Sequence, residues 1–339
     1  MKKIISAILV CVLAMGMLTG CGKVTMDDIL KDTNMVIGSV DGQDIHAYEM
    51  IFYLKQGMGA QEVQDAIVQN KVLLNLAAEN GVEFNDDMQA QIDSFIESQT
   101  TQMGSKEALE QAVMEAGVTL DQYTSLYKEA LITQSAVDKI IELGVVKDAT
   151  DEEAREFFDK YCLKAQHILF STVSEDGQTP VDDETAKAKL AKAEETAKLI
   201  KDGADFDSFA NLNEDPGAES MPGGYVFANT SLITDEIVVA TVQQAGLAMV
   251  EPFEAGAAAL KPGEVSGVIT SNFGHHIIKR LELTDDDFEQ YKATIKGVVS
   301  NMKFTQFMTD AESKAKVEWN KSAVEALSTG VTPIQAAQQ

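Results

Sequence analysis

The chain has 339 residues, which is enough for two or three domains, and its 45% of hydrophobic residues is ordinary for a globular protein. Its 27 Lys and Arg against 54 Asp and Glu give a net charge of −27. Such a surface repels nucleic acid and anionic lipid headgroups, so nucleic-acid binding and polybasic membrane docking are excluded, while basic client segments can be attracted.

The N-terminus has the pattern of an export signal. A basic Met1-Lys2-Lys3 is followed by an uncharged, mostly apolar run over residues 4–22. The end of this run, Leu18-Thr19-Gly20-Cys21, resembles the lipobox of bacterial lipoproteins, in which the cysteine is lipidated and becomes the first residue of the mature chain. We therefore expect a signal peptide over 1–20 and a lipid anchor with a polar tether over 21–34.

The alternative is an uncleaved membrane helix, because the run is just long enough to span a bilayer. Small residues at its end, and the lack of a positive cluster after it, favour the lipoprotein. Acyl chains on Cys21 would hold the protein on the extracytoplasmic face of the cell membrane.

Three cysteines, Cys11, Cys21 and Cys162, cannot build a disulfide framework, since the first lies in the leader. Cys162 stands beside a predicted strand and is interpreted as a small core residue rather than a nucleophile.

A mostly helical lobe is predicted over residues 35–160. Asp41-Gly42 between apolar runs predicts a hairpin. Capping boxes at Thr119–Gln122 and Thr150–Glu153 open helices. Apolar periodicity predicts further helices over 63–80, after 85 and around 109–113. Met and aromatic side chains here could line a groove for unfolded apolar segments, or they could simply form the core.

Two short apolar runs that each contain histidine follow later in the chain. Strands are predicted over 164–170, which holds His167, and 275–283, which holds His276. If these strands are neighbours, the two histidines can meet, because paired residues on one face lie roughly 5 Å apart. Further strands are expected over 223–227 and 265–269, with helices over 183–201, 206–210 and 249–260.

Seven ordered blocks of this region resemble the parvulin peptidyl-prolyl isomerases. They are Ala165–Leu169, Asp205–Ala210, Glu214–Gly217, Gly223-Gly224, Met249–Glu254, Leu260–Ser266 and Phe273–Ile278. With the lipobox and the helical lobe, the whole chain is similar to the PrsA foldase lipoproteins, whose chaperone lobe is SurA-like.

The resemblance implies an α+β fold: a parvulin domain over 161–283, with a four-stranded antiparallel sheet and surrounding helices, inserted in the helical lobe. It implies catalytic roles for His167, His276 and Asp215, the last at the acidic or thiol position beside the histidines. It implies substrate-binding roles for the apolar residues Met249, Phe253, Phe273 and Leu169. No cofactor and no metal are implied.

Each of these residues also has an ordinary interpretation. Both histidines could be satisfied core groups, and Met249 with Phe253 could be packing, although their spacing places them on one face of a helix. Because His275 and His276 are adjacent on a strand, only one can face the site, and we assign His276. A metal site is disfavoured, since ligand spacing and carboxylate partners are missing.

The chain departs from the parvulin pattern at three places. Residues 228–248 stand where the family has a short connection, and a helix over 234–244 is expected above the socket. Ala258 replaces a common aromatic residue, and Tyr225 replaces the usual acid after Gly223-Gly224.

The closing segment predicts a long amphipathic helix from Thr284 through Val317, whose apolar face must be buried. We expect residues 284–327 to pack on the helical lobe and 328–339 to be disordered.

The main hypothesis is a membrane-anchored, extracytoplasmic foldase that isomerises X-Pro bonds in unfolded or partly folded secreted polypeptides, with a homodimer through the helical lobe as a further expectation. The alternative is a catalytically silent holdase that uses the parvulin module only for client binding. A third class, the solute-binding lipoproteins, would need the strand and helix alternation of two α/β lobes, which the sequence lacks.

Overall fold

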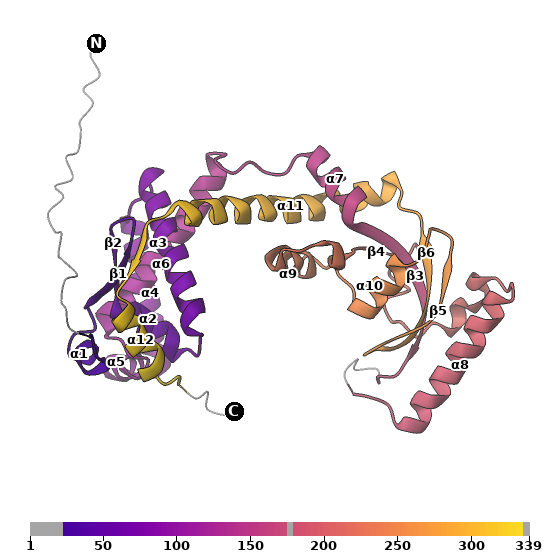
Figure 1. Ribbon diagram of the computed structural model, residues 1–339, viewed down its shortest axis with the longest axis horizontal. Coiled ribbons are helices and arrows are strands. Elements are labelled where there is room, and N and C mark those ends of the chain that lie inside the picture. The colour runs from indigo at the N-terminus through magenta and orange to yellow at the C-terminus, as the bar shows by residue number, and fades with distance from the viewer. Residues whose placement is uncertain (1–22, 175–178, 335–339) are drawn as a thin grey trace, which may run out of the picture. The chain divides into compact units, whose positions relative to one another are not determined.

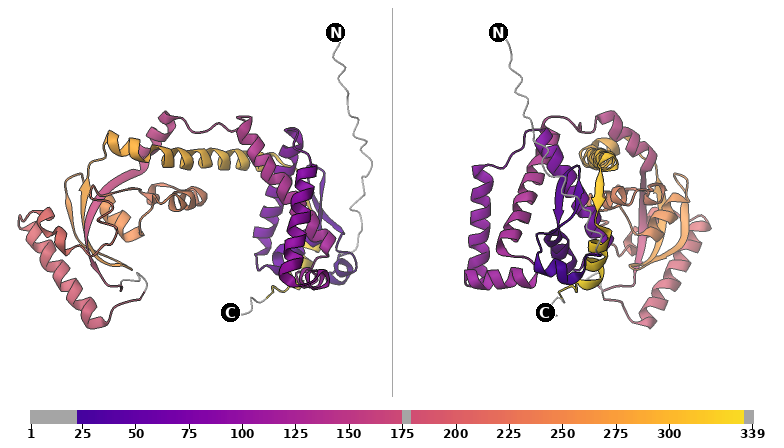
Figure 2. Two further views of the ribbon diagram at one scale, coloured as in Figure 1. Left: turned by 180° about the vertical axis from the view of Figure 1, so that it is seen from behind. Right: turned by 60° about the vertical axis from the view of Figure 1, so that its left-hand side comes forward.

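The computed structural model describes residues 23–174 and 179–334, so the expected signal peptide and Cys21 lie outside the described residues. The chain forms two compact units, one from residues up to Val145 together with Met308 onwards, the other from Val146 to Phe307 (Figures 1 and 2). None of the helices described combines the length and apolar character that a membrane span requires.

The first unit contains a small sheet with the strand order β2-β1-β7. Strands β1 (Val36–Val40) and β2 (Gln43–His46) form the predicted hairpin. Asp41 and Gly42 have φ values of 50° and 85°, the left-handed pair that suits a two-residue hairpin loop. On the other edge of β1 lies β7 (Val317–Trp319), which comes from the far end of the chain and pairs antiparallel.

Five helices make up most of the first unit, and the last four lie where they were predicted: α2 (Ala47–Lys55), α3 (Ala60–Glu79), α4 (Asp86–Met103), α5 (Lys106–Glu115) and α6 (Leu120–Glu142). The capping box before α6 is confirmed, since Thr119 Oγ1 accepts the Gln122 amide at 3.2 Å and Gln122 Oε1 accepts the Thr119 amide at 2.9 Å. This helix opens where the sequence indicated because two backbone donors are satisfied locally.

Predictions for the two ends of the first unit were partly wrong. The tether expected over 21–34 contains helix α1 (Met26–Lys31), which has its own capping box and a fully buried Ile29. The closing helix ends at Lys314, and Val317 lies in β7 because pairing with β1 satisfies its backbone groups. The tail expected to be disordered from 328 still belongs to helix α12 (Lys321–Gly330), which packs against α1 and buries Leu327.

The second unit is built on a four-stranded antiparallel sheet, as expected, with the order β4-β3-β6-β5. The strands are β3 (Cys162–Ser171), β4 (Tyr225–Ala228), β5 (Val265–Ser271) and β6 (Gly274–Leu281). One face packs against α10 (Glu251–Ala258) and the other against α8 (Asp183–Lys201) and the 3-10 helix η1 (Phe206–Leu212) (Figure 1). Alternation along β3 and β6 decides which side chains meet which helix.

A second cluster of the same unit joins α7 (Asp151–Tyr161), α9 (Glu236–Gln244) and the first part of α11 (Asp285–Lys314). Its buried apolar members include Phe158, Val242, Leu247, Ile295 and Val298. The helix expected in the 228–248 segment is therefore confirmed, but its expected place above the socket is wrong, because its apolar face is buried against α7 and α11. For the same reason these two helices group with the sheet, so the unit extends beyond the expected limits of 161 and 283.

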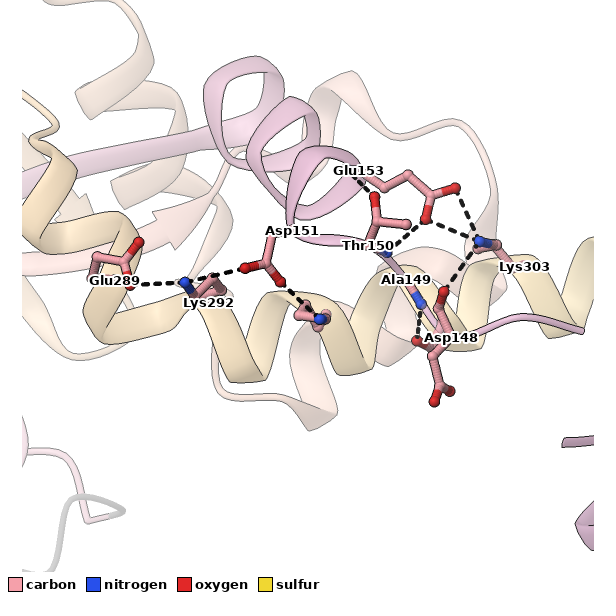
Figure 3. Close-up of polar contacts among 10 residues, drawn as sticks. Asp148, Ala149, Thr150, Asp151, Glu153, Glu289, Lys292 and Lys303 are labelled. Atoms are coloured by element: carbon pink, nitrogen blue, oxygen red, sulfur yellow. Dashed lines mark hydrogen bonds and ion pairs between the residues drawn. The ribbon is translucent and has the colours of Figure 1, made fainter. Parts of the chain in front are cut away.

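Ion pairs and a hydrogen bond connect the start of α7 with α11 (Figure 3). Asp151 pairs with Lys292 and Lys296 at 3.3 and 2.8 Å, and Glu153 pairs with Lys303 at 2.9 Å. The Ala149 amide donates to Ser300 Oγ at 2.8 Å. These exposed pairs orient α7 but add little stability on their own.

Candidate active site

His167 and His276 meet on the α10 face of the sheet. In the β3–β6 register His167 lies opposite Ile278 and Leu169 lies opposite His276, so the histidines are diagonal neighbours on one face. Their Nδ1 atoms are 2.9 Å apart. His167 Nε2 in turn lies 2.8 Å from Asp215 Oδ2, in the loop after η1. The structure thus brings together the three residues that the resemblance placed at the site.

The hydrogen bonds around these histidines form a chain with one consistent direction. Because an ionised carboxylate only accepts, the proton between Asp215 and His167 belongs to His167 Nε2. When His167 is neutral, its Nδ1 is an acceptor, so His276 donates from its Nδ1 and accepts at its Nε2.

Ser271, at the end of β5, supplies the donor that His276 Nε2 needs, at 2.7 Å. Its oxygen accepts the Phe273 amide at 3.1 Å, which orients the hydroxyl. His276 is buried, and burial together with the charge that His167 would carry lowers the pKa of His276 to about 3. The imidazole of His276 therefore stays neutral through the physiological range.

Asp215 is the fixed negative charge of the site. Burial by itself would raise its pKa, but hydrogen bonds from His167, Tyr225 and the Gly217 amide outweigh burial and hold the pKa well below its usual range. Tyr225 donates to Asp215 Oδ2 at 2.5 Å, and burial and this carboxylate raise the pKa of Tyr225. The phenol is thus a permanent donor to the carboxylate.

A cavity of about 950 Å³ opens beside the histidine pair. Its apolar wall includes every residue expected to bind substrate: Leu169, Met249, Phe253 and Phe273. Met249 lies two residues before α10 rather than on it, so the expected helical spacing of Met249 and Phe253 is wrong, although both reach the cavity. The Phe253 ring stands edge-on to both imidazoles, with centroids 5.2 and 5.6 Å away. The site therefore combines an apolar hollow with hydrogen-bonded polar groups on one wall.

His275 and Cys162 do not line the cavity. His275 points to the α8 face, as expected for a neighbour of His276, and its Nδ1 contacts Thr270 Oγ1 at 3.0 Å. Cys162 is buried, and burial raises the pKa of its thiol to about 12, as befits a core residue. In the part of the chain that the structure describes, no group of His, Cys, Asp and Glu side chains could hold a metal ion.

Sequence reasoning missed two contributors to this site. Ser271 gave no signal, because a serine at a strand end is common. Glu254, one residue after Phe253, is buried and binds both ends of the 228–248 segment: its carboxylate accepts the Thr230 hydroxyl at 2.5 Å and the Met249 amide at 2.8 Å. A carboxylate inside the pattern Pro-Phe-Glu-Ala could have been flagged as a buried acceptor, since the neighbouring positions are apolar.

The second unit matches a known domain family. Residues 151–284 match the family model of the PPIC-type PPIASE domain. Proteins called "Foldase protein PrsA" from Staphylococcus aureus strains RF122 and Newman are 29% identical over 318 residues, covering 91% of this chain and 86% of theirs.

Solved structures that this chain is similar to include PrsA of Streptococcus pneumoniae, 23% identical, with 87% of this chain and 94% of that chain covered and a TM-score of 0.30. They also include PrsA of Bacillus cereus, at 20% identity, 90% and 95% coverage and a TM-score of 0.31. A SurA-like chaperone of Campylobacter jejuni is 13% identical, with 84% and 99% coverage and a TM-score of 0.33. Residues 151–284 thus match the PPIC-type PPIase domain, and most of the chain is similar to the PrsA foldases.

Proposed function

We propose that the second unit isomerises X-Pro peptide bonds of unfolded or partly folded secreted polypeptides. The observation that carries this proposal is the pair His167 and His276, whose Nδ1 atoms lie 2.9 Å apart and which Asp215 extends into a hydrogen-bonded chain, on the wall of an apolar cavity. His167, His276 and Asp215 are the proposed catalytic residues, and Leu169, Met249, Phe253 and Phe273 the proposed substrate-binding residues.

The reaction breaks no covalent bond. It removes only the partial double-bond character of the amide C–N bond while that bond rotates. Rotation about an X-Pro bond is opposed by a barrier of about 20 kcal/mol and takes roughly 10 to 100 s without a catalyst. The planar amide separates more charge than the twisted one, because resonance moves electron density from nitrogen to oxygen. A dry cavity that takes the proline ring therefore favours the twisted form.

The hydrogen-bonded chain adds a fixed electrostatic environment to this apolar cavity. Ser271 and Asp215 hold the two imidazoles in place, so neither ring has to reorient while the amide turns. Cys162 lies outside the cavity lining and its thiol is protonated, so no covalent step through it is required.

The first test is an isomerisation assay on the chain that begins after Cys21, with a proline-containing test peptide. We expect the wild type to accelerate isomerisation and the double variant His167→Ala/His276→Ala to lose at least tenfold in kcat/KM. His46→Ala is the matched control, because this histidine caps α2 in the first unit and should leave the rate unchanged. A double variant as fast as the wild type removes the histidines from the mechanism.

The same protein preparation distinguishes an isomerase from the alternative, a holdase that only binds clients. If the wild type suppresses aggregation of an unfolded client but does not accelerate isomerisation, the parvulin module only binds. The helical first unit would then be the part of the chain that binds unfolded clients and keeps them from aggregating.

We also propose that Cys21 anchors the chain to the extracytoplasmic face of the cell membrane. The support is the lipobox-like Leu18–Cys21 at the end of an apolar leader. Labelled palmitate should enter the wild type and not Cys21→Ser, and the variant should leave the membrane fraction. Labelling of the variant to the same extent would reject this anchor.

A further inference from the structure

Tyr225 sits where its ring must face the histidine pair. It follows Gly224 at the start of β4 and pairs with Ala165 of β3, which lies two residues before His167 on the same face. The rings of Tyr225 and His167 meet edge-on, with centroids 5.8 Å apart and an interplanar angle of 89°. Both side chains end at the same oxygen of Asp215.

The Asp215 carboxylate has three donors in a fixed arrangement. Oδ2 accepts from His167 at 2.8 Å and from Tyr225 at 2.5 Å, while Oδ1 accepts from the Gly217 amide at 2.9 Å. Since His167 is only one of these donors, the orientation of the carboxylate is set as much by Tyr225 as by the histidine it serves.

Gly217 makes room for the phenol. A Cβ at this position would lie 2.7 Å from the Tyr225 hydroxyl and 3.3 Å from Asp215 Oδ1, closer than side chains tolerate. The backbone of Gly217 is not in the left-handed region, so any residue could adopt its conformation. What requires glycine here is the space that the hydroxyl occupies.

We propose that Tyr225 is a positioning residue of this site, whose hydroxyl, admitted by Gly217, holds the Asp215 carboxylate against His167. Without the hydroxyl, the partly buried carboxylate loses a donor and becomes easier to protonate. A protonated Asp215 no longer requires the proton on His167 Nε2, so the direction of the whole hydrogen-bond chain is lost. Tyr225 thereby extends to lower pH the range in which the hydrogen bonds from Asp215 to His276 keep the same donors and acceptors.

The direct test is a carbon-13 titration of the Asp215 carboxyl in the whole chain, which does not depend on any activity. In Tyr225→Phe we expect its midpoint to rise by roughly one pH unit, because a hydrogen bond to a charged group is lost. Tyr161→Phe is the matched control, since this tyrosine packs with Phe157 of α7 outside the cavity lining, and should leave the midpoint unchanged. An unmoved midpoint in Tyr225→Phe overturns the proposal.

A substitution at Gly217 tests the same hydrogen bond between Tyr225 and Asp215 without changing either residue. Gly217→Ala should raise the midpoint while Tyr225 is present, because the methyl group displaces the hydroxyl. In Tyr225→Phe/Gly217→Ala the added methyl group has no hydroxyl to displace, so the double variant should match Tyr225→Phe. Additive shifts would mean that Gly217 and Tyr225 act independently, which contradicts the proposal even if Tyr225→Phe alone were poorly folded.

The kinetic consequence rests on the proposed isomerase function. A carboxyl whose pKa lies well below its usual range is still ionised at pH 5 after a rise of roughly one unit, so any loss of kcat/KM in Tyr225→Phe should be the same at pH 5 and pH 8. A wild type without isomerase activity would reject the proposed function, yet the carboxyl titration would still decide the role of Tyr225.

Discussion

The Nδ1 atoms of His167 and His276 lie 2.9 Å apart although the two histidines are 109 positions apart in the chain. His276 Nε2 contacts the Ser271 hydroxyl and His167 Nε2 contacts the Asp215 carboxylate, so the two imidazoles and their partners form one hydrogen-bonded chain. The site thus combines this polar chain with an apolar cavity.

The free energy of unfolding should decrease as the pH is lowered, and part of this decrease should depend on His276. Its pKa is lowered from 6.5 to about 3 in the folded state, so below pH 6.5 the unfolded chain binds a proton that the folded chain does not. The contribution of this histidine is therefore complete above pH 6.5 and is lost as the pH falls toward 3. Asp215, whose pKa is also lowered, extends the loss to more acidic solutions.

Urea unfolding of the wild type and of His276→Asn between pH 7 and 4.5 measures this effect. The wild type should lose about 1 kcal/mol more of its unfolding free energy per pH unit than the variant does below pH 6. His275 and the other titrating groups are shared by both proteins, so they cancel in the comparison. Parallel curves would show that His276 is protonated equally in the folded and unfolded states.

Glu254 should control the shape of the substrate cavity. Glu254→Ala leaves the Thr230 hydroxyl and the amides of Thr230 and Met249 without their acceptor, which should cost about 2 to 3 kcal/mol of stability. Because Met249 lines the cavity, we expect KM for a proline peptide to rise more than kcat falls. Glu195→Ala, on the exposed side of α8, is the control and should change neither quantity. A lower kcat at constant KM would assign Glu254 to the reaction step instead.

Lys71 should be essential to the first unit, because it is the cation that pairs with the carboxylates of both Glu49 and Glu129. Its ammonium lies 2.9 Å from both Glu49 and Glu129, and the Lys71 and Glu49 side chains are 3% and 2% exposed. Lys71→Met should cost about 3 kcal/mol or more by urea unfolding, since it leaves buried charge unpaired. Lys106→Met removes an exposed lysine of α5 and should cost less than about 1 kcal/mol.

The triple variant Lys71→Met/Glu49→Gln/Glu129→Gln tests the reason for that loss. With no charge left in the cluster, most of the stability lost in Lys71→Met should return. If the triple variant is as unstable as the single one, packing of the lysine stem rather than charge pairing explains the effect.

Local signals in the sequence determined the elements of this protein. The hairpin at Asp41-Gly42, the capping boxes of α6 and α7 and helix α8 (Asp183–Lys201) lie where the pattern of caps and apolar spacing placed them. Alternation on a strand showed that only one of His275 and His276 could face the site, and the resemblance to the parvulins pointed to His276. These features depend on neighbours in the chain, so the chain alone reveals them.

Tertiary contacts decided the rest. Helix α9 was expected from its periodicity, but only the apolar surface offered by α7 and α11 determined where it packs. Likewise β7 replaced the end of a helix because β1 had an unpaired edge, and α1 formed in a segment that reads as polar because α12 covers Ile29. Tyr225 drew notice only as a departure from a pattern. Its hydrogen bond to Asp215 depends on the register of β3 with β4 and on the space at Gly217, and no stretch of sequence contains both.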